Sequence, residues 1–510
     1  METSRTRDAF AGAAAAALAL GVSELLAGLF SGLPSLVEGL GSWVIDNVPK
    51  PVKDFAIEVF GTYDKLALLI GIALVTILIG AVVGVFSRER FGIAIGAFVG
   101  FGVIASWAGA WNGGVGIGVA AIPGGAAALT GLMSLRWLYG LGQKAPSEEG
   151  SDPSRRHFIL GAGALVGLAA LTGVVGRSLV EKAKMAVSGR SEVVLPVPAE
   201  KLPAVPAAAE LGIDGLSPVI VPNADFYRID TAFSVPRVDL QDWTLTVRGL
   251  VERPYTIDYF DLLDMRTIER DVTLSCVSND VGEGLVGNAR WQGVPLTEIL
   301  DRAGVQDNAE QIVGRSVDDF TVGFPVEAAY DGREALVAVG MNGEPLPFEH
   351  GFPARLVVAG LYGYVSATKW LSEIVLTGWD EFNAYWIPRG WSKEAPIKTQ
   401  SRVDTPRRNE VIPPGPRSVA GVAWAPSRGI EKVEVQLGDD AGWVEAELSE
   451  ALSENSWVQW RVDWDVPIGA HHIRVRATDG TGETQTEEIR PPAPDGATGW
   501  HTISVFAQEA

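Results

Sequence analysis

Five long stretches of this chain contain at most one charged residue each, and they constrain its fold more than any other feature. They are residues 9–32, 66–86, 91–111, 115–137 and 158–176. Because a helix of roughly 20 apolar residues crosses a bilayer, this pattern predicts five transmembrane helices within residues 1–177. The lipid bilayer is therefore the first expected partner of the chain.

The basic residues around these stretches predict their orientation. Arg5 and Arg7 precede the first stretch, Arg88 and Arg90 separate the second from the third, and Arg136, Lys144, Arg155 and Arg156 lie around the gap between the fourth and fifth. Because cytoplasmic loops are enriched in Lys and Arg, we expect the N-terminus inside the cell and everything after about residue 177 outside. Lys50 and Lys53 are exceptions. The Arg155-Arg156 pair also resembles a twin-arginine export signal, with a plain cytoplasmic flank as the alternative.

Two further features of the membrane region have open interpretations. Gly92, Gly96 and Gly100 recur at four-residue spacing, which allows close packing of helices, although a region so rich in glycine would show this spacing by chance. Glu24 is the single charged residue of the first stretch. It marks either a quinone or proton site or simply a carboxylate near a helix end.

The rest of the chain divides by composition into three segments. Residues 178–214 are rich in Pro and Ala, which predicts an extended linker. Residues 215–405 mix short strand-like and helix-like runs, which predicts an α+β domain. Residues 406–510 alternate polar and apolar positions between turn residues, and about seven short strands at this spacing fit a β-sandwich.

Charge and cysteine content exclude several classes of function. The net charge of −21 argues against a nucleic-acid partner, because binding phosphates requires clustered Lys and Arg. Cys276 is the single cysteine, which excludes internal disulfides, iron–sulfur clusters and cysteine-based zinc sites. Any function of this thiol is therefore exerted alone or with a cofactor.

The surroundings of Cys276 favour a site over a purely structural position. A lone cysteine is more often a small buried apolar residue. Here polar Ser278 and Asn279 follow it, and a glycine-rich stretch comes next, as at a strand end that opens into a cleft. A thiolate is a soft ligand, suited to a metal that is held mainly by another sulfur chelate.

Two other segments carry residues of interest. His350 and Arg355 flank a Gly/Pro-bounded loop, and Arg355 with Lys369 offers a forked charge and a point charge to one phosphate. The alternatives are a structural histidine and solvated surface charges. The segment 222–230 holds Asn223, Tyr227 and Arg228, which alone form only an aromatic turn with charges.

Together these segments resemble the sulfite oxidase family of molybdopterin enzymes, in particular its membrane-anchored actinobacterial type, over roughly residues 215–510. The resemblance implies a molybdenum–molybdopterin cofactor, an α+β domain of the sulfite oxidase type and a C-terminal immunoglobulin-like dimerisation domain. It implies Cys276 as the molybdenum ligand, with Cys276 and Arg228 catalytic. The cofactor contacts that it implies are Asn223, Tyr227, Arg228, Asp318, His350, Arg355, Ala367, Thr368 and Lys369.

Departures from the family pattern bear on the substrate. Sulfite oxidases carry an Arg-Asn-His run where this chain has Arg228-Ile229-Asp230, and a tyrosine with a Gly-rich turn where it has residues 422–427. Groups that would hold sulfite are thus partly missing. We expect oxygen-atom transfer on a small S- or N-oxide-type substrate, with a quinone or another membrane or envelope electron carrier as redox partner and a possible homodimer. The alternative is a non-catalytic anchored module that binds a partner through its β-sandwich.

Overall fold

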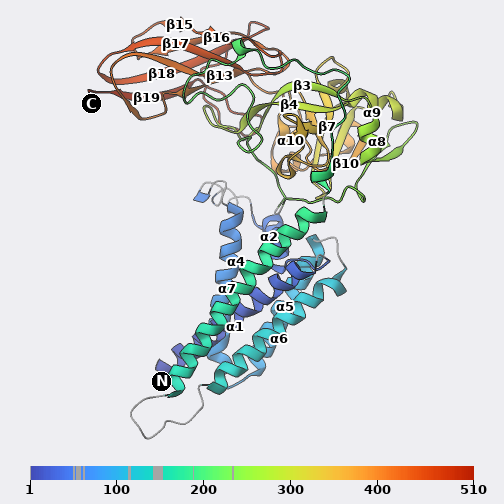
Figure 1. Cartoon of the computed structure of the whole chain (residues 1–510), viewed down its shortest axis with the longest axis vertical. Coiled ribbons are helices and arrows are strands. Elements are labelled where there is room, and N and C mark those ends of the chain that lie inside the picture. The colour runs from blue at the N-terminus through green and yellow to red at the C-terminus, as the bar shows by residue number, and fades with distance from the viewer. Residues whose placement is uncertain are drawn as a thin grey trace. The chain divides into compact units, whose positions relative to one another are not determined.

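The computed structural model describes residues 2–30, 32–49, 64–112, 116–141, 153–187, 189–232 and 235–509, together with Val52, Phe55, Val59 and Phe60 (Figure 1). The chain forms two compact units, Met1–Val187 and Ser188–Ala510. The boundary follows the last long helix, ten residues beyond the predicted end of the membrane region at residue 177.

The first unit is helical. Its helices are α1 (Glu2–Leu29), α2 (Leu36–Asn47), α4 (Asp64–Ser87), α5 (Gly92–Asn112), α6 (Ile117–Leu141) and α7 (Pro153–Val187). All of these except α2 are long and apolar enough to cross a membrane, which confirms the five predicted helices. The shorter α2 begins where Ser35 accepts a hydrogen bond from the backbone N–H of Glu38 (3.1 Å), the usual cap of a helix N-terminus.

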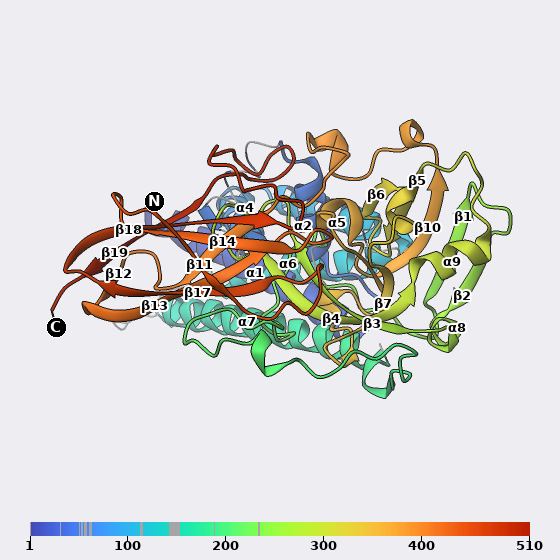
Figure 2. The ribbon, with the colours of Figure 1, turned by 90° about the horizontal axis from the view of Figure 1, so that it is seen from above.

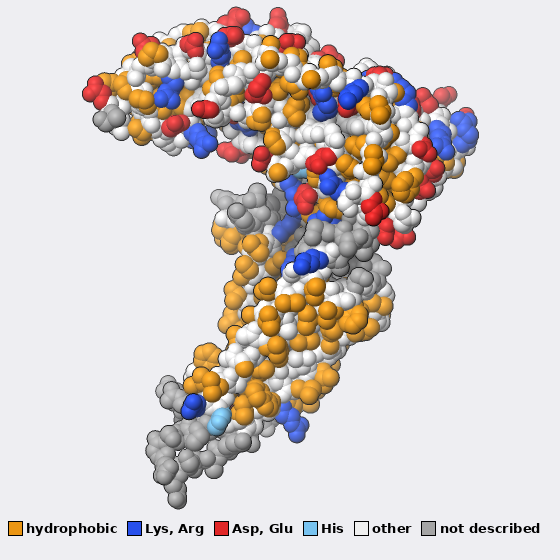
Figure 3. Space-filling model, in the orientation of Figure 1, with side chains coloured by type: hydrophobic (Ala, Val, Ile, Leu, Met, Phe, Trp, Pro, Cys, Tyr) orange, Lys and Arg blue, Asp and Glu red, His pale blue; other side chains and the backbone are white. Residues whose placement is uncertain are grey.

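The face of this unit seen in Figure 3 carries many exposed apolar side chains. Leu78, Phe86 and Val174 have 64%, 64% and 70% of their surface exposed. Small side chains such as Ala11 and Ala15 fill the interior, where α1 packs against α4, α6 and α7. Continuous exposed apolar surface is rare on proteins surrounded by water and is typical of helices that contact lipid.

Glycines bring these helices together, but not those at the predicted positions. A Cβ atom at Gly12 would lie 2.0 Å from the carbonyl oxygen of Gly80, so α1 and α4 approach closely there. At Gly92, Gly96 and Gly100 a Cβ atom would meet nothing within 4 Å. Of the two interpretations of this spacing, close helix packing is therefore wrong and chance remains, because a side chain at these positions would border open space.

Two sheets build the first part of the second unit. One has the order β2 (Tyr255–Asp258), β1 (Thr244–Gly249), β10 (Leu371–Thr377), β5 (Gln311–Ser316) and β6 (Thr321–Pro325). The other runs β3 (Ile268–Ser275), β4 (Val286–Pro295), β7 (Ala335–Met341) and β8 (Glu344–Pro345), with β9 (Arg355–Val358) paired to β7. Helices α8 (Tyr259–Asp264), α9 (Leu296–Ala303) and α10 (Gly363–Ser366) connect them.

Two more sheets form the C-terminal part, where β13 lies beside β17 and β14 beside β18 (Figure 2). The first sheet runs β11 (Gln400–Thr405), β13 (Gly415–Trp424), β17 (Val458–Val466) and β16 (Glu447–Leu448). The second runs β12 (Glu410–Ile412), β19 (His501–Ala507), β18 (Gly469–Asp479), β14 (Ile430–Leu437) and β15 (Trp443–Glu445). Both contribute to one apolar core, as the alternating pattern predicts. The immunoglobulin-like assignment stays a prediction.

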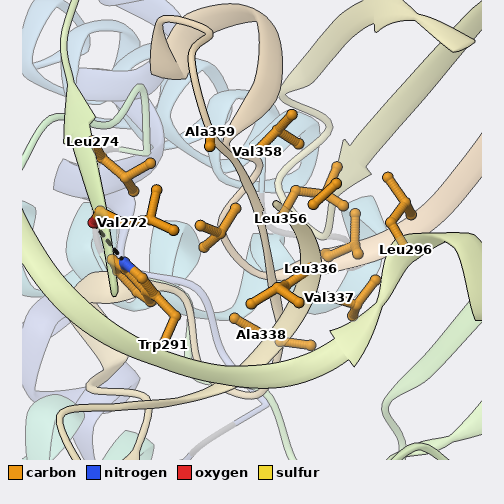
Figure 4. Close-up of a cluster of buried hydrophobic side chains, with 14 of the residues drawn as sticks. Val272, Leu274, Trp291, Leu296, Leu336, Val337, Ala338, Leu356, Val358 and Ala359 are labelled. Carbon is orange, nitrogen blue, oxygen red and sulfur yellow. Dashed lines mark hydrogen bonds between the residues drawn. The ribbon is translucent and has the colours of Figure 1, made fainter. Parts of the chain in front are cut away.

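The core of the α+β part explains why its strands are rigid (Figure 4). Every residue of β7 is buried, because its sequence is almost wholly apolar. Trp291 is fully buried, and its indole N–H donates to the carbonyl oxygen of Val272 (3.1 Å), which ties β4 to β3. The strand ends that carry the site therefore start from a fixed framework.

Of the segment predicted as a linker, residues 178–187 continue helix α7, and residues 189–214 lie along the second unit. Arg190 donates to the carbonyl oxygen of Leu346 (2.7 Å), and the backbone N–H of Ala199 donates to that of Thr267 (2.8 Å). Farther on, the backbone N–H of Leu211 donates to the side chain of Gln459 (2.7 Å). Residues 189–214 are thus held against the unit at several points.

Candidate functional site

Loops from distant parts of the second unit converge on one cavity. It is lined by residues that follow β3, by the turn between β5 and β6, by the start of β9 and by the segment after α10. The lining residues that bear on its chemistry are Tyr227, Asp230, Cys276, Ser278, Asp318, His350, Arg355, Tyr364, Ala367, Lys369, Trp370, Trp386 and Trp391. Binding residues commonly lie on loops that a rigid scaffold positions.

Cys276 begins the loop after β3 and reaches this cavity. Its backbone N–H donates to the carbonyl oxygen of Leu285 (2.9 Å), and its own carbonyl accepts from the N–H of Asn279 (3.1 Å), so a tight turn fixes it. The thiol is free and buried. Burial raises its pKa, while hydrogen bonds from the backbone and hydroxyl of Ser278 act in the opposite direction. These donors would support a thiolate ligand.

Arg355 is a buried cation facing the same cavity. Its guanidinium donates to the carbonyl oxygens of His350 (3.2 Å) and Leu356 (3.3 Å) and stacks over the ring of Trp291 (5.0 Å). Among the residues that the structure describes, no carboxylate pairs with it, and burial lowers its pKa to about 10. A buried charge without a counter-ion is costly, so this position is suited to an anionic group of a ligand.

His350 is held in its neutral form beside Arg355. Its Nε2 lies 2.9 Å from the carbonyl oxygen of Asn223, and its ring meets the edge of Phe226. Burial lowers its pKa to about 4. The neighbouring Gly351 has φ 108°, and a Cβ atom there would lie 3.0 Å from the backbone of Lys369. Glycine therefore allows the His350 loop and the Lys369 segment to touch.

The neutral state of His350 gives a pH dependence of stability. The unfolded chain takes up this proton near pH 6.5, whereas the folded chain resists it until about pH 4. The stabilisation is present above pH 6.5 and is lost as the pH falls through this window. Thermal midpoints of cofactor-free protein between pH 7 and pH 4 should decline less steeply for His350→Gln. His501, whose pKa is also lowered to about 4, contributes in the same direction, and the exposed His472 is the control. Equal slopes for wild type and His350→Gln would contradict the assignment.

Lys369 lies in the cavity but already has a partner. Its Nζ donates to Oδ2 of Asp230 (2.9 Å), which also accepts from Nε of Arg228 (2.8 Å). The Lys369 and Asp230 side chains are 10% and 4% exposed. Burial lowers the pKa of Lys369 to about 8, and Asp230 counteracts this. The backbone after Lys369 is unusual, because Trp370 has φ 51°, rare for a bulky residue, and its indole donates to the carbonyl oxygen of Phe348 (2.8 Å).

The remaining predicted residues fall into two groups. Tyr227, Asp318 and Ala367 line the cavity with Cys276, His350, Arg355 and Lys369. Asn223, Arg228 and Thr368 are not among its lining residues. The Asn223 amide donates to Glu344 (2.6 Å), half-exposed Arg228 pairs with Asp230, and Thr368 faces Gly314. Their assignment to the site stays a prediction.

An aromatic wall completes the cavity and was not predicted. Tyr364 packs on Trp391 with ring centroids 5.7 Å apart, and Trp386 meets Trp391 at 6.4 Å. The Tyr364 hydroxyl donates to the carbonyl oxygen of Ser392 (2.6 Å), which fastens the loop. Scattered tryptophans in a loop carry no recognisable spacing, so the sequence offered no signal for this wall.

The residues present fit a thiolate-bound metal carried by a phosphorylated chelator. The thiol supplies one soft ligand, and Arg355 supplies a cation that lacks a protein anion. Neutral His350 adds a hydrogen-bonding group to the same cavity.

Comparisons with known proteins indicate the same kind of cofactor. Residues 232–386 match the family described as "Oxidoreductase molybdopterin binding domain". The chain is 27% identical to mitochondrial sulfite oxidase of Homo sapiens over 320 residues, covering 53% of this chain and 58% of that protein. It is 27% identical to NADH nitrate reductase of Spinacia oleracea over 319 residues, covering 50% and 34%.

A solved structure shares the fold. The sulfane dehydrogenase SoxCD of Paracoccus pantotrophus superimposes with a TM-score of 0.50 at 22% identity, over 59% of this chain and 85% of that one. The chain spans only about one third to three fifths of the length of the curated relatives it matches. Residues 232–386 therefore form a molybdopterin-binding oxidoreductase domain, and sulfite oxidase and nitrate reductase are among the relatives that share it.

Proposed function

We propose that this chain is a membrane-tethered molybdenum–pterin oxidoreductase that transfers an oxygen atom to or from a small S- or N-oxide-type substrate on the outer side of the membrane. One observation carries the proposal: a buried free thiol and a buried guanidinium without a carboxylate line the same cavity. Cys276 would ligate molybdenum, and Arg355 and His350 would contact the pterin and its phosphate. When bound, the cofactor supplies two-electron redox chemistry and oxygen-atom exchange.

The protein's own groups prepare the site for this reaction. Hydrogen bonds from Ser278 favour the thiolate form of Cys276. The wall of Tyr364, Trp386 and Trp391 keeps water from the reacting atoms and offers an apolar surface to the body of a substrate. Neutral His350 donates its single N–H to the carbonyl oxygen of Asn223, so its Nδ1 can accept a hydrogen bond without adding a charge.

A substrate screen tests this function. Full-length protein in detergent would be given reduced methyl viologen with a series of sulfoxides and N-oxides, and separately sulfite with ferricyanide. We expect dye oxidation with at least one oxide. Molybdenum-loaded protein without activity in either direction would instead favour the anchored binding module.

Asp230 argues against a doubly charged oxyanion as substrate. Its carboxylate neutralises Lys369 inside the cavity, so a sulfite ion there would meet less positive charge than the cation count suggests. Asp230→Asn is expected to tighten inhibition by sulfate about tenfold, because removing a buried charge next to Lys369 is worth at least ~1.4 kcal/mol. Inhibition constants measured on loaded enzyme would check this. Asp319→Asn, an exposed carboxylate outside the cavity, is the control. An unchanged constant in Asp230→Asn would contradict this reasoning.

The outward orientation is supported by the distribution of arginines around the helices. Alkaline phosphatase folds to an active form only outside the cytoplasm, so its fusion after the C-terminus should be active. A fusion after Leu141, at the end of α6, should be inactive. The reverse pattern would place the site in the cytoplasm.

A further inference from the structure

A cavity of about 320 Å³ lies within the helical unit, apart from the molybdopterin site. Its walls come from α1, α2, α4, α5 and α6, and most of the lining is apolar side chain or glycine. Water avoids such surfaces, and the cavity opens at the surface of the helical unit, where its lining residues Ile79 and Ile104 are 50% and 55% exposed. The cavity is therefore suited to an apolar ligand.

The face of α5 that contacts no other helix borders this cavity. Gly96 and Gly100 both line it, and a Cβ atom at either would meet nothing within 4 Å. Phe98 and Phe101 of the same helix also line it. Because the two glycines have no side chain and lie beside two aromatic rings, they leave a space that suits a flat ring with an apolar tail.

Two hydroxyl side chains interrupt the apolar lining of the cavity. Ser23 and Thr76 line it, and their hydroxyls donate to their own helices, at the carbonyls of Leu20 (2.7 Å) and Ile72 (2.8 Å), so that their oxygens can still accept. Glu24 follows Ser23 and is only 8% exposed. Its carboxylate accepts hydrogen bonds from the hydroxyl of Ser35 and from the backbone N–H of Val37 (3.4 Å), and Val37 also lines the cavity.

We propose that this cavity binds an isoprenoid quinol, with its ring between the α5 phenylalanines and the hydroxyls of Ser23 and Thr76. A phospholipid acyl chain would use only the apolar wall and leave the acceptor positions of these two hydroxyls unused. The identity of the quinol as electron donor rests on the proposed function. Oxidation of the quinol to the quinone releases two electrons and two protons, and reduction of a sulfoxide or N-oxide consumes two of each to give the deoxygenated product and water.

Filling the cavity tests the proposal. Gly96→Leu and, independently, Gly100→Leu place a side chain in the open space without a backbone clash. Gly92→Leu is the matched control, because it lies on the same helix with equally free space but does not line the cavity. Equilibrium binding of decylubiquinol and of a short-chain menaquinol to full-length protein in detergent should weaken about tenfold or more in the first two variants and remain unchanged in Gly92→Leu.

Two other outcomes would overturn the proposal. Equal binding of both quinols by wild type and Gly96→Leu would show that they do not enter the cavity. Displacement of a co-purified phospholipid by Gly96→Leu, with no quinol bound by wild type, would assign the space to an acyl chain. Reduced methyl viologen bypasses the cavity and reports on the molybdenum site separately. Absence of dye-driven turnover in wild type would contradict the proposed function, while the binding comparison would still decide the cavity.

Discussion

Replacing Cys276 with serine is expected to remove molybdenum from the purified protein and to lower activity by more than the roughly 10- to 100-fold that loss of an outer-shell partner costs. The hydroxyl is a harder and far less acidic ligand than the thiol, so it does not replace the thiolate at a sulfur-ligated metal. Elemental analysis of metal per chain and dye-driven turnover would be measured together. Cys276 is the single cysteine, so the change affects no other thiol.

The pterin provides the control for this variant. Arg355 and His350 remain in Cys276→Ser, so released pterin should fall less than molybdenum does. Cys276→Ala should behave like the serine variant, because both lack the thiolate. Full molybdenum content and activity in either variant would show that the thiol is only a buried apolar group.

Replacing Arg355 with methionine is expected to affect the loaded and cofactor-free proteins in opposite directions. Loaded protein should lose most of its pterin and its activity, because the cation that would meet the phosphate is gone. Cofactor-free protein should become more stable, on the order of 1 kcal/mol, because a buried guanidinium without a carboxylate is replaced by an apolar side chain. Pterin fluorescence and the thermal midpoint of cofactor-free protein would be measured.

Arg402 is the matched comparison. It is also buried, but it pairs with Asp404 (2.6 Å) and donates to the hydroxyl of Ser217 (2.9 Å). Arg402→Met should therefore destabilise the protein, because it leaves Asp404 buried without its partner. Destabilisation of cofactor-free protein by Arg355→Met to the same degree would mean that Arg355 supports the fold rather than a ligand.

Much of the architecture could be predicted because it depends on local patterns. Apolar length predicts the five long helices, and alternation predicts the C-terminal strands. The convergence of Cys276, His350, Arg355 and Lys369 on one cavity was expected from the family resemblance. Spacing alone would not have given it, because these residues lie on four separate segments.

The contacts that individual side chains make inside the folded chain could not be predicted. Lys369 was expected to contact a phosphate. In the structure its Nζ donates a hydrogen bond to Asp230, which lies 139 positions earlier in the chain. The Thr368 hydroxyl faces Gly314 rather than the cavity. The Gly96–Gly100 spacing predicts a packing face only when another helix lies opposite, and that depends on how α5 is rotated within the unit.

The most direct test of the central claim is the metal and pterin content of full-length protein purified in detergent from a host that loads other molybdoenzymes. Elemental mass spectrometry and the fluorescence of released pterin would be read on the same sample. The structure predicts one molybdenum and one pterin per chain, since one cavity combines the single thiol with Arg355. Protein that is folded but contains neither molybdenum nor pterin would contradict the account.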